Sequence, residues 1–126
     1  MKIVNLKYNE FEQFVRNHPL RNYYQSVAYG TLMSNFGFKP LYIGFVHEGK
    51  LVGASLILHV PIFMGFKYGY APHGILLNYN DYQLIPDAVK KLKSYLFRQS
   101  FLILKIDPLI IKSTRNKDGN ILTQNG

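Results

Sequence analysis

The chain has 126 residues, 48% of them hydrophobic and 17% charged, which suits about one folded domain and excludes a disordered polymer. It contains no cysteine, which excludes disulfides and thiolate metal sites. No apolar run reaches the ~18 residues of a membrane span, and the N-terminus has no signal-peptide pattern. We therefore expect a soluble, cytoplasmic protein.

The charge balance is basic, with 15 Lys and Arg against 7 Asp and Glu and a net charge of +8. Such an excess suits contact with a polyanion, such as a phosphate-bearing ligand, RNA or an anionic membrane surface. The densest group is Lys90, Lys91 and Lys93. We interpret these three lysines as the solvent face of a helix rather than a binding site.

The first predicted elements are a strand and a helix. Residues 2–8 alternate apolar and polar side chains, as a half-buried strand does. Asn9 is the predicted cap of a helix with Phe11, Phe14 and Val15 at helical spacing. The helix should end at residues 17–19, because Pro19 disfavours helical geometry at the residue before it.

A second helix is predicted from Gln25 or Ser26 to Phe36, with Gly37 as its C-terminal stop. Two strands follow at 41–47 and 51–60. The residues between them, Glu48-Gly49-Lys50, have the composition of a tight hairpin connection.

The second half of the chain contains a strand at about 66–71, a helix at 81–98 and a short buried strand, "SFLILKID". Pro86 fits the first turn of that helix. The helix carries one apolar stripe, made of Ile85, Ala88, Val89, Leu92, Tyr95 and Leu96. Residues 112–126 are polar and rich in turn formers, so we expect a tail or a connection there.

The predicted order is β-α-α-β-β-β-α-β. This order indicates a mixed α/β fold, with an antiparallel meander and a right-handed crossover helix into a neighbouring strand. The sheet should be mixed, mostly antiparallel and flanked by helices.

Common catalytic motifs are missing. There is no glycine-rich phosphate loop, no His-x-x-x-His metal pair and no Gly-x-Ser-x-Gly elbow. His18, His47 and His59 fall in different elements, and we expect structural or surface roles for them.

His73 is better placed, because it follows a strand end and precedes Gly74, whose missing side chain allows close approach of a ligand or backbone. A plain turn residue is the competing interpretation. Tyrosines combine apolar area with a hydroxyl and suit sugar or peptide contact as well as a half-buried strand. The candidates are Tyr23, Tyr24, Tyr29, Tyr68, Tyr70, Tyr79 and Tyr82.

Three stretches together resemble a known family. They are "FEQFVRNHPLRNYYQSVAYGTLMSNFGFKP", "GKLVGASLILHVPIFMGFKYGYAPHGILLNYND" and "FLILKIDP". Their order over residues 11–108 is similar to that of the Fem-type (FemA, FemB and FemX) peptidoglycan bridge aminoacyltransferases. The resemblance implies a GNAT-like acyltransferase fold, here the incomplete first domain over 1–111, with 112–126 leading towards a missing remainder.

The resemblance also implies a function and partners. Such proteins transfer an amino acid from aminoacyl-tRNA to an amine of a muropeptide precursor, either lipid-linked or UDP-linked, without a metal or other cofactor. This chain would then be a precursor-binding fragment without full activity, with tRNA bound by a missing domain. Transient contact with the inner face of the membrane and a homodimer through exposed sheet edges are further expectations.

The sequence departs from the family pattern at the site. His73-Gly74-Ile75 stands where the family usually has Arg-Gly-Pro, and Met33 stands where some members have a phosphate-binding lysine. We do not expect His73 to be the catalyst; it is better described as a weak, pH-dependent anion contact or a turn residue. No catalytic residue is assigned. The predicted substrate-binding residues are Tyr29, Tyr70, His73, Gly74 and Tyr79.

Three other functions stay open. An acyl-CoA-dependent GNAT-type N-acyltransferase would need a pyrophosphate loop before a helix, and none is present. A non-catalytic interaction module would use the exposed sheet edges. A general RNA-binding domain lacks its usual aromatic and basic signatures.

Overall fold

The computed structural model describes residues 1–107, which contain five strands and three helices. In chain order these are β1 (Lys2–Asn5), α1 (Tyr8–Arg16), α2 (Val27–Ser34), β2 (Lys39–His47), β3 (Lys50–Pro61), β4 (Lys67–Pro72), α3 (Leu84–Arg98) and β5 (Phe101–Asp107). The predicted tail over 112–126, and with it the end of the predicted domain at 111, lies outside the described residues.

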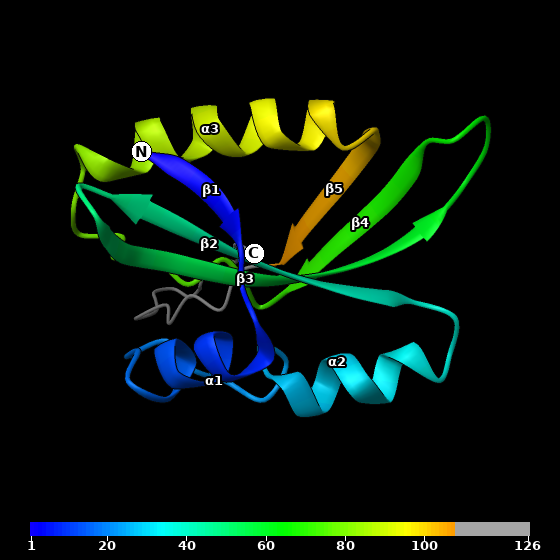
Figure 1. Ribbon diagram of the computed structural model, residues 1–126, viewed down its shortest axis with the longest axis horizontal. Coiled ribbons are helices and arrows are strands. Elements are labelled where there is room, and N and C mark those ends of the chain that lie inside the picture. The colour runs from blue at the N-terminus through cyan, green and yellow to red at the C-terminus, as the bar shows by residue number, and fades with distance from the viewer. Residues whose placement is uncertain (108–126) are drawn as a thin grey trace, which may run out of the picture.

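The strands form one sheet in the order β1-β2-β3-β4-β5. The first four pair antiparallel, and β5 pairs parallel to β4 after the α3 crossover. Helix α3 covers one face of the sheet, and α1 with α2 covers the other (Figure 1). The predicted order, the antiparallel meander and the crossover into a neighbouring strand are confirmed.

Both faces of the central strands are buried, because helices cover both. Alternate side chains of β2 and β3 point to opposite faces: Ile43, Phe45 and Ile57 pack towards α3, whereas Leu56 and Leu58 pack towards α1 and α2. This two-sided burial explains the nearly continuous apolar run along β3.

The first helix begins earlier than predicted. The strand stops at Asn5, and α1 has Lys7, not Asn9, at its N-cap. The Glu10 carboxylate accepts a hydrogen bond from the Lys7 backbone N–H at 2.7 Å. The Glu10 side chain, inside the first turn, therefore takes part in capping the helix, a role that the sequence predicted for Asn9.

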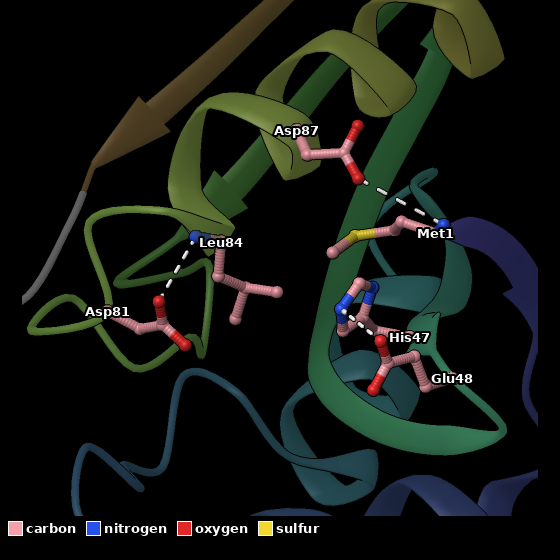
Figure 2. A network of polar contacts seen from close by, with 6 residues as sticks. All are labelled: Met1, His47, Glu48, Asp81, Leu84 and Asp87. Atoms are coloured by element: carbon pink, nitrogen blue, oxygen red, sulfur yellow. Dashed lines mark hydrogen bonds and ion pairs between the residues drawn. The ribbon is translucent and has the colours of Figure 1, made fainter.

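Helices α2 and α3 are shorter than predicted. Ser26 caps α2 by accepting from the Tyr29 N–H at 3.1 Å, and the helix ends at Ser34 rather than Phe36. Asp81 lies before α3 and accepts from the Leu84 N–H at 3.2 Å, so the helix starts at 84 rather than 81 (Figure 2). None of the helices in residues 1–107 has the length and apolar character needed to cross a bilayer.

The prediction that the last strand is buried is wrong. β5 lies at an edge of the sheet, and Leu102 and Ile103 are each 51% exposed. Val89 of the predicted α3 stripe is also 43% exposed. Apolar composition does not distinguish a central strand from an edge strand, because burial depends on which segments cover it.

Candidate functional site

The five predicted site residues lie on three parts of the fold. Tyr29 is in α2 and Tyr70 in β4, whereas His73 and Gly74 directly follow β4. Tyr79 lies in the loop before α3. The structure brings Tyr29, Tyr70, His73 and Gly74 to the region where α2 begins and where β4 and β5 end.

A buried glutamine holds this region together. Gln25 is fully buried, and its Nε2 donates to the carbonyls of Leu56 at 3.2 Å and Pro72 at 2.9 Å. Its Oε1 accepts from the Leu56 N–H at 2.7 Å. Gln25 thereby links Pro72, the residue before His73, to the centre of β3 through hydrogen bonds.

Gly74 packs directly against this glutamine. A Cβ at Gly74 would lie 2.8 Å from Gln25 Nε2 and 3.0 Å from Ser55 Oγ. Both distances are shorter than a normal contact. The space that the glycine leaves is therefore occupied by the protein's own buried polar side chains.

His73 is held in a left-handed backbone conformation, with φ of 49°. Its ring packs on Tyr24 with centroids 4.8 Å apart, and Tyr24 packs edge-on against Tyr29 at 5.0 Å. The Asn22 Nδ2 donates to the His73 carbonyl at 3.2 Å. We call Asn22, Tyr24, Tyr29, Tyr70 and His73 the tyrosine–amide cluster.

Tyr70 and Tyr29 present neutral hydroxyls. Burial raises the pKa of both, and Asp107 raises the pKa of Tyr70 further. The Tyr70 hydroxyl donates to Asp107 Oδ2 at 3.3 Å, and Lys105 Nζ lies 5.5 Å from the Tyr70 ring centroid. At neutral pH these phenols therefore act as hydrogen-bond donors and acceptors rather than as anions.

Two buried polar atoms of the cluster have no hydrogen-bond partner within residues 1–107, Asn22 Oδ1 and His73 Nδ1. Buried polar atoms are normally satisfied, and a third buried atom without a partner in residues 1–107, His47 Nδ1, lies outside the cluster. Nothing in the described residues orients the His73 ring through Nδ1, as a general base requires.

Tyr79 lies apart from the cluster. Its hydroxyl donates to the Ile75 carbonyl at 2.5 Å. Its ring lines an apolar cavity of about 680 Å³ between the end of α1 and the start of β3. Buried His18 also lines this cavity, where its Nδ1 accepts from the Leu20 N–H at 3.1 Å and burial lowers its pKa.

The sequence matches the FemAB family over residues 6–126. The chain belongs to the FemAB family. Aminoacyltransferase FemB of Staphylococcus epidermidis (strain ATCC 12228 / FDA PCI 1200) is 30% identical over 126 aligned residues, 98% of this chain and 30% of that protein. Aminoacyltransferase FemA of Staphylococcus aureus (strain MW2) is 29% identical over 122 aligned residues, which are 96% of this chain and 29% of that protein. This FemAB chain thus spans less than a third of the length of these relatives.

Solved structures confirm the GNAT-like fold of this FemAB-family chain. The crystal structure of FemX superposes with a TM-score of 0.71 and 18% identity, covering 86% of this chain and 27% of FemX. The ribosomal-protein-alanine N-acetyltransferase of Brucella melitensis biovar Abortus 2308 superposes with a TM-score of 0.55 and 14% identity, covering 99% of both chains.

Asn22, Gln25 and Asp107 were not predicted as site residues. No local pattern in the sequence marks them, because the partners of their side chains lie far away in the sequence. Gln25 bonds Leu56 and Pro72, Asn22 bonds His73, and Asp107 accepts from Tyr70.

Proposed function

We propose that this FemAB-family chain takes part in peptidoglycan interpeptide-bridge synthesis, in which an amino acid passes from aminoacyl-tRNA to an amine of a muropeptide precursor. The names of the relatives support aminoacyl transfer, and the GNAT-like fold is compatible with acyl transfer to an amine. The precursor and the charged tRNA are cytoplasmic, so the proposed role places the chain there.

Within that reaction, the chain supplies part of the wall that binds the precursor. The observation that carries this assignment is the pair of buried unpartnered atoms, Asn22 Oδ1 and His73 Nδ1, beside the stacked Tyr24 ring. Tyrosine rings and amide groups suit the sugar and peptide parts of a muropeptide. Lys105 adds a cation beside the cluster.

The chemistry of the reaction is aminolysis of an activated ester. The neutral amine attacks the ester carbonyl, a C–N bond forms, the C–O bond to the ribose breaks, and the amine proton ends on the ribose hydroxyl. Positioning and stabilisation of the developing oxyanion supply the rate enhancement. By itself the chain binds and orients the precursor without completing the transfer.

A calorimetric titration tests precursor binding. The chain is titrated with a UDP-linked muropeptide, with UDP alone and with acetyl-CoA. We expect binding of the muropeptide that weakens in Asn22→Ala and Tyr24→Ala, while the exposed control Tyr82→Ala binds as the parent does. If the chain binds acetyl-CoA but not the muropeptide, it is instead a CoA-dependent acyltransferase. If it forms a stable dimer and binds none of these ligands, it is an interaction module.

A transfer assay tests the enzymatic part. Charged tRNA and muropeptide are supplied to the chain alone and to any extension of its reading frame past Gly126. We expect transfer by the extended protein and none by the chain alone. No transfer by the extended protein, under conditions in which FemA or FemB is active, would contradict the proposed reaction.

A further inference from the structure

The turn between β3 and β4 exposes four large apolar side chains in succession. Ile62 is 43% exposed, Phe63 56%, Met64 87% and Phe66 38%. The turn projects from the sheet, beyond the C-terminal end of α3 (Figure 1). We call residues 62–66 the apolar tip.

The geometry of the turn does not require these residues. The Phe66 N–H donates to the Phe63 carbonyl at 2.9 Å, and Met64 and Gly65 have φ of 53° and 83°. Positive φ at both central residues is the pattern of a type I′ turn, which favours Asn-Gly or Asp-Gly. Methionine at the first position combines an unfavourable backbone conformation with an exposed apolar side chain.

The other hairpin of the sheet provides an internal comparison. The β2–β3 turn has the same pair of positive φ values, 52° at Glu48 and 78° at Gly49. There the first position carries a charged side chain that is 85% exposed. The same turn is therefore built with a charged residue at one end of β3 and an apolar one at the other.

Three cations lie near the base of the apolar tip, where β3, β4 and the end of α3 adjoin. Lys67 begins β4, and its N–H donates to the Ser100 carbonyl at 2.9 Å. The end of α3, which carries Arg98, therefore lies near the start of β4. Lys39 pairs with His59 in the sheet, and the charges of Lys67 and Lys39 add to burial in lowering the pKa of His59.

Acidic residues lie elsewhere. Residues 13–47, 49–80 and 88–106 contain no Asp or Glu, and these ranges include the segments next to the apolar tip. Glu48, Asp81 and Asp87 lie at the opposite end of β3, where Asp87 is 4.0 Å from the Met1 amine and Glu48 is 3.8 Å from His47 (Figure 2). These three carboxylates therefore lie away from the apolar tip, at an end of the sheet that also carries Lys2 and Lys50.

We propose that the apolar tip inserts into the surface of an anionic lipid bilayer, with Phe63 and Met64 reaching below the headgroups and Lys39, Lys67 and Arg98 facing lipid phosphates. Apolar side chains beside clustered cations suit such an interface. A protruding turn is too small to bury the ~1,000 Å² that a specific protein–protein interface needs. The inference goes beyond the proposed transferase role and holds or fails independently of it.

A single tryptophan gives a direct test, because the chain contains none. Phe63→Trp places an indole in the tip, and Tyr82→Trp places one at a control position, 81% exposed in the loop before α3. Vesicles contain phosphatidylcholine with about 30 mol% phosphatidylglycerol as the anionic lipid. We expect a blue shift and quenching by brominated lipid for Phe63→Trp, and neither for Tyr82→Trp.

Vesicle sedimentation tests the contribution of the tip to binding. The double variant Phe63→Ser/Met64→Asn should bind these vesicles at least about tenfold more weakly, while Tyr82→Ser/Val89→Ser binds as the parent does. Binding of the parent should fall with added salt and on vesicles without anionic lipid. Circular dichroism checks that every variant is folded.

Four results would overturn the inference. The first is a parent protein that does not bind anionic vesicles, and the second is a double variant that binds them equally well. The third is an indole at position 63 that stays exposed to water while the protein is bound. The fourth is a dimer that forms without lipid and dissociates in the double variant, because the tip would then bind a second copy of the chain.

Discussion

The side-chain amide of Gln25 donates a 2.9 Å hydrogen bond to the carbonyl of Pro72, the last residue of β4. The same amide bonds both backbone groups of Leu56 in β3. One buried side chain thus joins the segment before α2 to two strands. It sets the position of His73, the residue that follows Pro72.

Replacing Gln25 by Leu should destabilise the protein. The change removes the Gln25 partner of the Leu56 N–H and the Pro72 carbonyl, while the Leu56 carbonyl keeps the Ser55 hydroxyl at 3.0 Å. We expect a loss of roughly 2–4 kcal/mol in the free energy of unfolding. Urea denaturation measures this loss. The same change at exposed Gln99 is the control, with an expected effect within about 0.5 kcal/mol; equal effects at both positions would contradict the bridging role of Gln25.

Replacing His73 by Arg should strengthen binding of the UDP-linked muropeptide severalfold. Arginine is permanently charged and can bond phosphate oxygens in pairs, which a histidine cannot do. Calorimetry at neutral pH measures the change. His47→Arg makes the same substitution outside the tyrosine–amide cluster and should leave binding unchanged. An unchanged affinity in His73→Arg would favour a plain turn residue.

Alkaline pH should destabilise the protein through Tyr42. Burial, followed by the nearby Tyr8 and Glu12, raises the pKa of Tyr42 from 10.0 to about 12. The folded state therefore holds its proton more tightly than the unfolded state. The resulting stability, roughly 2–3 kcal/mol, is fully present below pH 10 and is lost as the pH rises through about 12.

Tyr42→Phe checks this effect. The variant should lose stability less steeply over that pH window, by about 1.4 kcal/mol per pH unit, as followed by urea denaturation. The other buried tyrosines remain in both proteins and cancel from the comparison. Tyr82→Phe, at an exposed position, should follow the parent; identical slopes for parent and Tyr42→Phe would contradict the prediction.

Met64→Asn should stabilise the fold while it weakens vesicle binding. Asparagine tolerates the left-handed conformation that Met64 adopts at φ of 53°, so we expect a gain of about 0.5–1 kcal/mol in the free energy of unfolding. Glu48→Asn, in the matching turn, should give a similar gain without any change in vesicle binding. A destabilised Met64→Asn would show that the methionine has a structural role in the turn.

Local signals predicted most of the elements. Ser26 before an apolar segment, Glu48-Gly49 between two strands and Pro86 in the first turn of α3 act over a few residues, and each lies as expected. The predicted starts of α1 and α3 were wrong, and in both places a carboxylate bonds a backbone N–H three residues away. Glu10 satisfies the backbone of Lys7, and Asp81 that of Leu84, which moved the start of α1 and α3.

The sequence by itself determined the element order, a sheet flanked by helices and membership of the FemAB family, because periodicity and motif order are properties of the chain alone. Only the tertiary structure decided which residues meet. Asn22 reaches His73 and Tyr70 reaches Asp107 across the fold, whereas Tyr79 lines an apolar cavity elsewhere. The apolar strand β5 proved to be a half-exposed edge. Contacts between distant segments and burial at an edge depend on packing in three dimensions, which no local pattern encodes.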